Sequence, residues 1–201
     1  MKPIIITIGR QFGSGGHELG RKLAARLGIP FYDRELLTEA AARTDLTKEM
    51  IESLDEKPTN SFLYSLSVGS YGFSADVQLP LENRVFLAMT EVIREAADKG
   101  SCVIVGRCAE YVLADRKEDL VRVFVRADRD ARIARIREHF DVSEKEAAAM
   151  MTKTDKKRAN YHDFYCDDKW GALTSYDIVV NSSLLGIDGA VDMLAHYAQN
   201  R

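Results

Sequence analysis

Residues 5–28 read IITIGRQFGSGGHELGRKLAARLG, and this stretch decides the fold. The β-branched run at residues 3–8 predicts a strand that is covered on both faces. A glycine-rich turn follows, and leucines then recur at the spacing of one helix face over residues 16–27, before Gly28 ends the helix. A strand, a glycine turn and the positive end of a helix together predict a phosphate site, because backbone N–H groups converge there.

Strands and helices alternate along the rest of the chain. Further β-rich runs lie at residues 29–33, 101–107, 120–126 and 176–181. Helices are predicted at residues 34–57, in two pieces, and at 81–99, 128–140, 143–161 and 187–199. Residues 58–80 show no sustained period and predict an irregular loop over a cleft. Strands separated by helices predict an α/β fold with a parallel sheet, whose ligands bind beyond the carboxyl ends of the strands.

The composition restricts the class of protein. The chain has 201 residues, which suits one domain, and its 46% hydrophobic and 29% charged residues indicate a soluble globular protein. A net charge of −3 and the lack of a long apolar segment predict a cytoplasmic protein without general affinity for nucleic acid or membranes. Three cysteines without a CxxC pair indicate a reduced compartment. A monomer and a homodimer are both compatible with the sequence.

The glycine-rich turn lacks the lysine of the standard phosphate-binding pattern G-x-x-x-x-G-K-[ST]. In one register Gly16 replaces the lysine, whereas in the other His17 replaces it and Glu18 replaces the Ser/Thr. The second register is favoured, because it keeps a group that can become cationic and an oxygen that can ligate Mg²⁺. Ser14 is the other candidate ligand for Mg²⁺. The residues expected to hold the phosphates of a nucleotide are Arg10, Gly13, Ser14, Gly15, Gly16, His17 and Glu18.

Two other interpretations of the turn are open. It can be a tight strand–helix connection without a ligand. It can also begin a dinucleotide-binding G-x-G-x-x-G loop at Gly13, with Asp33 about 20 residues further on to bind a ribose. Glu18 disfavours this second interpretation, since it stands at the third glycine and would turn a carboxylate towards a pyrophosphate.

Five ordered segments resemble the cytidylate kinase-like family, a branch of the P-loop nucleoside monophosphate kinases. They are GRQFGSGGHELGRKLAARLGIPFYDRELL (9–37), CVIVGRCAEYVL (102–113), VFVRADRDARIARI (123–136), DKKRANYHDFY (155–165) and YDIVVNSS (176–183). The resemblance implies a three-layer P-loop kinase-like α/β fold, with a five-stranded parallel sheet of order 2-3-1-4-5, helices on both faces and a helical lid. It also implies ATP and Mg²⁺ as cofactors, and a nucleoside monophosphate as the acceptor, with CMP or dCMP as first candidates.

The same resemblance divides the chain, a single domain of residues 1–201, into three parts. These are a core (1–33, 100–140 and 174–201), a helical acceptor-binding insertion (about 34–99) and a lid (about 129–165). The chain departs from true cytidylate kinases, which carry the loop lysine, have aspartate where Cys108 follows Gly106-Arg107, and have Asp-Thr in place of Asn181-Ser182. A nucleotide-binding protein with little catalysis and a P-loop kinase of another small molecule are therefore the alternatives.

Charged residues after the strands are the candidates for binding the acceptor. An arginine fork can bond two oxygens of a monophosphate at once, and an aspartate can bind a sugar hydroxyl. The expected acceptor-binding residues are Asp33, Arg34 and Arg107. A helix cap at Asp33 and a surface ion pair at Arg107 are the alternatives.

Basic residues of the lid are the candidates for catalysis. Cationic groups that close over both phosphates would stabilise the charge of the transition state and exclude water. The expected catalytic residues are Arg132, Arg135, Lys153 and Arg158. The alternatives are a solvated basic face and, less favoured because the chain lacks interleaved exposed aromatics and a basic balance, a contact with nucleic acid. The four histidines lack metal-ligand spacing, so no metal site made by the protein alone is expected.

Overall fold

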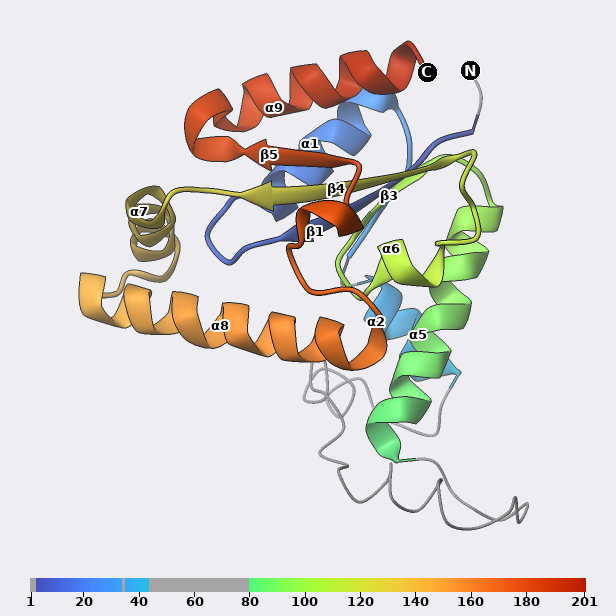
Figure 1. Cartoon of the computed structure of the whole chain (residues 1–201), viewed down its shortest axis with the longest axis horizontal. Coiled ribbons are helices and arrows are strands. Elements are labelled where there is room, and N and C mark those ends of the chain that lie inside the picture. The colour runs from blue at the N-terminus through green and yellow to red at the C-terminus, as the bar shows by residue number, and fades with distance from the viewer. Residues whose placement is uncertain (1–2, 34, 44–79) are drawn as a thin grey trace.

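The computed structural model describes residues 3–33, 35–43 and 80–201 (Figure 1). Arg34, the second piece of the predicted helix 34–57 and nearly all of the predicted loop 58–80 lie outside the described residues. The strands are β1 (Ile5–Arg10), β2 (Phe31–Tyr32), β3 (Cys102–Val105), β4 (Leu120–Arg126) and β5 (Ile178–Asn181). In the described part they form a five-stranded sheet of order β2-β3-β1-β4-β5 with parallel pairing throughout, which confirms the predicted fold.

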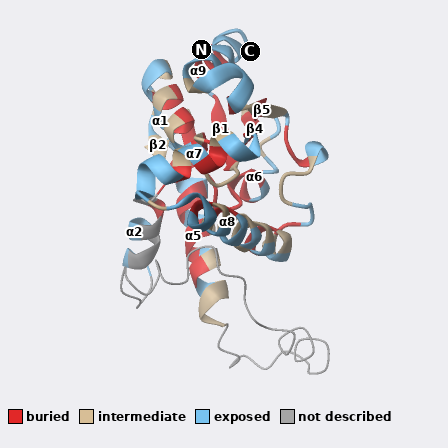
Figure 2. Cartoon of the chain, turned by 90° about the vertical axis from the view of Figure 1, so that its left-hand side faces the viewer, coloured by how far each residue is buried: buried red, intermediate tan, exposed pale blue. Residues whose placement is uncertain are grey.

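Helices cover both faces of this sheet. Their bounds are α1 (Gly16–Leu27), α2 (Glu35–Ala42), α5 (Leu81–Asp98), α6 (Ala109–Val112), α7 (Arg129–Phe140), α8 (Glu144–Tyr165) and α9 (Ser182–Gln199). The strands and the inward sides of α1, α5 and α9 are buried, while most of α8 is exposed or half-buried (Figure 2). None of the helices within residues 3–33, 35–43 and 80–201 has the length and apolar character needed to cross a lipid bilayer.

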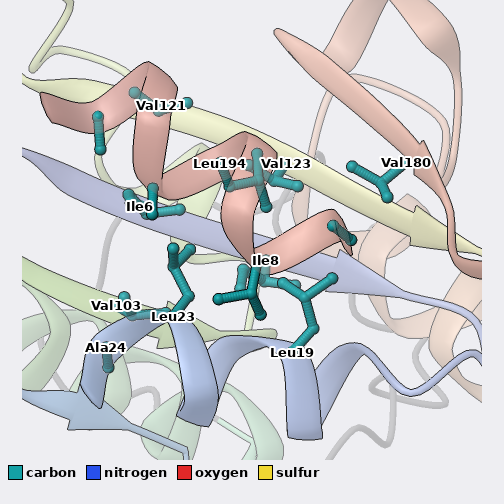
Figure 3. Packing of buried hydrophobic residues seen from close by; sticks show 14 of the residues in the cluster. Ile6, Ile8, Leu19, Leu23, Ala24, Val103, Val121, Val123, Val180 and Leu194 are labelled. Carbon is teal, nitrogen blue, oxygen red and sulfur yellow. The ribbon is translucent and has the colours of Figure 1, made fainter. Parts of the chain in front are cut away.

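The alternation of side chains along β1 creates two cores. Ile6 and Ile8 point to one face, where they pack with Leu19 and Leu23 of α1 and Leu194 of α9 (Figure 3). Ile5 of the same strand points the other way and packs on the opposite face of the sheet, against α5 and α6. A central strand buried on both sides explains why residues 4–8 are isoleucines except for the buried Thr7, rather than alternating between apolar and charged residues.

Some element bounds differ from the predicted ones. The second strand is only two residues long, and α8 continues to Tyr165. The last helix begins at Ser182 rather than at residue 187. Its backbone is non-helical at Gly186 (φ 69°, ψ 172°), where the helix is kinked. α6 was not predicted, because it is only four residues long and follows a turn of unusual backbone geometry. The predicted capping box that opens α8 is present, with Ser143 and Glu146 bonded reciprocally.

Truncation of Leu23 tests the core between β1, α1 and α9. Leu23 is fully buried, so Leu23→Ala should lower the free energy of unfolding by about 2–5 kcal/mol through lost burial and the cavity left behind. Arg21→Ala, on the exposed side of the same helix, should change it by less than about 0.5 kcal/mol. Urea denaturation measures both variants, and similar losses for the two would contradict the packing.

Candidate functional site

The turn between β1 and α1 lies at the carboxyl edge of the sheet, and its glycines are required by its shape. Gly13 and Gly15 both adopt a left-handed conformation (φ 77°). A Cβ atom on Gly13 would also lie 2.8 Å from the carbonyl oxygen of Arg132, and one on Gly15 would clash with Ile187. α7 and α9 therefore press directly against the turn.

Arginines of α7 hold two carbonyl groups of this turn. Arg132 Nε donates to the carbonyl of Phe12 (2.7 Å), and Arg135 Nη1 donates to that of Gly13 (2.8 Å). In a planar trans peptide the C=O and the following N–H point in opposite directions. The N–H of Gly13 therefore points away from Arg132.

Two further side chains hold carbonyls at the ends of the turn. The hydroxyl of Ser182, at the start of α9, donates to the carbonyl of Ser14 (2.6 Å), and Arg158 of α8 donates to that of Arg10 (3.1 Å). By the same peptide geometry, the N–H of Gly15 points away from Ser182. No side chain of the described residues caps the N-terminus of α1, so its first N–H groups are available to an anion.

Asp155 of α8 binds both the turn and Arg132. One of its carboxylate oxygens accepts from the N–H of Phe12 (2.8 Å), and the other pairs with Arg132. The buried guanidinium of Arg132 is thereby bonded to the turn and to α8 at once. The sequence did not predict the contacts of Asp155 and Ser182, because their partners lie 143 and 168 positions away.

The other candidates from the turn have partners of their own. The Ser14 hydroxyl is fully buried and donates to the carbonyl of Gln11 (2.8 Å). Glu18 pairs with Lys22 (3.0 Å), which also reaches Asp188 of α9 (2.7 Å). Magnesium ligation by Ser14 or Glu18 would require these contacts to be exchanged.

His17 and two of the expected acceptor residues, Asp33 and Arg107, come together at the ends of β2 and β3. His17 Nε2 lies 3.2 Å from one oxygen of Asp33, and Arg107 Nη1 lies 3.7 Å from the other. Asp33 and Arg107 are buried, whereas the His17 side chain is 58% exposed. The histidine predicted to replace the lysine thus lies beside the predicted acceptor residues. Lys153 is exposed on α8.

The turn after β3 has a strained backbone. Arg107 (φ 59°) and Cys108 (φ 55°) are consecutive non-glycine residues in the left-handed region, a conformation that costs about 1–3 kcal/mol per residue. Gly106 before them leaves room for the side chain of Arg10, whose guanidinium occupies the position a Cβ atom would take. The strained turn brings the side chains of Arg107 and Cys108 under α8.

A small cavity lies between this turn and α8. Its volume is about 20 Å³, enough for one water molecule. Three arginines line it: Arg10, Arg107 and Arg158. Residues of β1, the turn after β3 and α8 thus meet at the carboxyl edge of the sheet, and the buried side chain of Glu110 lines the same cavity.

Buried groups of α6 and α8 adjoin this cavity. His162 Nε2 lies 3.0 Å from Glu110 Oε1, and both side chains are buried. Burial lowers the pKa of His162, but hydrogen bonds with Cys166 and Glu110 outweigh it and raise the pKa to about 10. A hydrogen bond from Cys108 lowers the pKa of Cys166 despite the opposing effect of burial. Glu110 was not among the residues singled out from the sequence.

Comparison with solved structures supports the class of protein. Shikimate kinase from Bacteroides thetaiotaomicron aligns over 98% of each chain with 17% identity and a TM-score of 0.56. A gluconokinase from Sinorhizobium meliloti covers 98% of this chain and 95% of its own, with 17% identity and a TM-score of 0.50. An uncharacterised protein from Eubacterium ventriosum is 35% identical over 98% of this chain and 99% of its own, with a TM-score of 0.74.

The sheet order, the glycine turn and these similarities define a protein with the fold of P-loop kinases. Residues 5–184 match the cytidylate kinase-like family, and the chain belongs to that family. No curated protein matches its sequence.

Arg132 tests how the turn is held. Arg132→Ala should lower the free energy of unfolding by about 3 kcal/mol, because it removes the donor to Phe12 and leaves the Asp155 carboxylate without its ion-pair partner. Arg137→Ala, exposed on the same helix, should change it by less than about 0.5 kcal/mol. Urea denaturation gives both values, and equal stability of the two variants would refute the structural role of Arg132.

Proposed function

We propose that this protein transfers a phosphoryl group from ATP to a nucleoside monophosphate, with CMP or dCMP as first candidates. The observation that carries the proposal is the position of Arg135. Its guanidinium carbon would lie 3.3 Å from a Cβ atom on Gly15, at the start of α1, while its Nη1 bonds the carbonyl of Gly13. A fixed cation at the N-terminus of a helix is suited to neutralise phosphate, and Arg135 would take over the task of the missing lysine.

The donor nucleotide would bind at the N-terminus of α1. The amides from Gly15 to His17 would bind its phosphates, and Arg135 would orient them. Bound ATP with Mg²⁺ would supply the group to be transferred, with Ser14 or Glu18 as the candidate metal ligands. The Asp155 carboxylate accepts a hydrogen bond from the N–H of Phe12, and Arg132 balances its charge. The carboxylate therefore adds little repulsion towards a phosphate.

The acceptor phosphate would lie among Arg10, Arg107 and Arg158, with Asp33 near its sugar. The cavity of about 20 Å³ is far smaller than the roughly 300 Å³ of a small-molecule pocket, so α8 must move outward to admit an acceptor. Its return would bring Arg158 back over the phosphates and exclude water from the reaction.

A nucleotide-binding protein with little catalysis is the second candidate function. The absence of the loop lysine and the pairing of its replacement, His17, with Asp33 favour it. In that case the same turn would bind a nucleotide. The movement of α8 would then be a conformational response to the bound nucleotide and not a step of a catalysed reaction.

A reaction panel tests the proposal. The purified protein is mixed with Mg²⁺, ATP and each of a series of monophosphates, with shikimate and gluconate as acceptors of other classes. We expect ADP and a nucleoside diphosphate to form fastest with CMP or dCMP. Calorimetric binding of ATP without turnover would favour the second candidate. Turnover with only a non-nucleotide acceptor would overturn the choice of acceptor but retain the kinase activity.

Arg135 tests the proposed replacement of the lysine. Loss of one fixed donor to a developing charge costs on the order of 100-fold in kcat, so Arg135→Ala should show a loss of this size, with Arg135→Lys in between. Arg137→Ala, two residues further along the same helix, should keep the parent kcat. A kcat for Arg135→Ala within about twofold of the parent would exclude Arg135 from phosphate neutralisation.

A further inference from the structure

The proposed phosphoryl transfer assigns no role to one cluster of buried side chains, part of which lines the same cavity as the three arginines. Donor atoms of Glu110, His162 and Cys166 all lie within 4.8 Å of one another, and all three residues are buried. Glu110 comes from α6, His162 lies in the last turn of α8, and Cys166 is the residue that caps the C-terminal end of α8. The spacing His-x-x-x-Cys puts His162 and Cys166 on the same face of the helix, turned towards α6.

We propose that Glu110, His162 and Cys166, with Cys108 as the fourth ligand, form a binding site for a zinc ion. Cys108 is buried and hydrogen-bonded to Cys166, but its sulfur is not among the donors that all lie within 4.8 Å of one another, so it would have to move towards the ion to complete the set. Two sulfurs, one imidazole nitrogen and one carboxylate oxygen match the donors that Zn²⁺ takes in tetrahedral sites. Mg²⁺ and Ca²⁺ require oxygen ligands, and this set would reject them.

The surroundings of His162 agree with ligation through Nε2. Among the described residues, its buried Nδ1 has no hydrogen-bond partner, and the nearest carboxylate oxygen, on Asp163, lies 3.6 Å away. Histidines that bind a metal commonly donate the other ring N–H to a carboxylate, which fixes the ring. A small rotation of the ring towards a metal would complete this contact.

The charge balance also allows a cation here. Arg10, Arg107 and Arg158 line the adjoining cavity and would repel an isolated dication. One carboxylate and two thiolates carry three negative charges, so a site with Zn²⁺ would have a net charge of −1, which these arginines would stabilise.

The consequence of binding follows from the elements that the site joins. α6 begins directly after the turn that holds Arg107, and His162 lies about one helical turn beyond Arg158 on α8. A zinc ion would tie these segments together and favour the closed position of α8 over the outward position that admits an acceptor.

A metal titration tests the site independently of any kinase activity. The full chain, reduced and stripped with a chelator, is titrated with Co²⁺ and then with Zn²⁺. We expect one equivalent of Co²⁺ to give thiolate charge-transfer and tetrahedral d–d absorption, and Zn²⁺ to displace it and raise the Tm. Absence of these bands, or their appearance only with several equivalents, would overturn the proposal.

Matched cysteine variants locate the site. Cys166→Ala and His162→Gln should each weaken Co²⁺ binding by more than about tenfold. Cys102→Ala removes a thiol that is equally buried but lies in β3, so it should bind Co²⁺ like the parent protein. Circular dichroism verifies that each variant is folded. Retained binding in folded Cys166→Ala would overturn the assignment, as would a Cys108–Cys166 disulfide in a protein that takes up no metal.

Discussion

The constraint on which the rest of the site depends is the fixing of the carbonyl groups in the glycine turn. Arg132 and Arg135 from α7 and Ser182 from α9 each donate to one of these carbonyls. Because a peptide group has a fixed geometry, this arrangement also determines where the N–H groups point. The glycines permit the required left-handed backbone, but the side chains of distant helices select it from the many conformations that glycine allows.

The same contacts couple the two halves of the proposed reaction. Asp155 bonds the turn on the donor side, and Arg158, almost one helical turn further along α8, bonds Arg10 and lines the acceptor cavity. Outward movement of α8 would break both contacts at once, and hydrogen bonds to charged groups contribute about 1.5–3 kcal/mol each. An open α8 would therefore loosen the phosphate-binding turn, and closure would restore it. The acceptor would in this way influence the binding of the donor.

Local patterns in the sequence predicted the fold well. The apolar run of β1, the leucines of α1 and the capping box at Ser143 depend on near neighbours, and the structure contains all three. The contacts of Asp155 and Ser182 bridge more than a hundred positions, and no periodicity or motif reports such a pairing. The sequence also did not predict the position of the His17 side chain. A side chain at the start of a helix can point towards the phosphates or towards the next strand.

The central claim is that the amides at the start of α1, oriented by the side chains that hold the turn, bind phosphate. The most direct measurement is an NMR titration of the ¹⁵N-labelled protein with Mg²⁺ and ATP, followed through the backbone amides. The signals of Gly13, Gly15, Gly16 and His17 should shift together along one saturable curve, and their hydrogen exchange should slow. Saturable ATP binding that leaves these four signals unchanged, or the absence of any binding, would contradict the account.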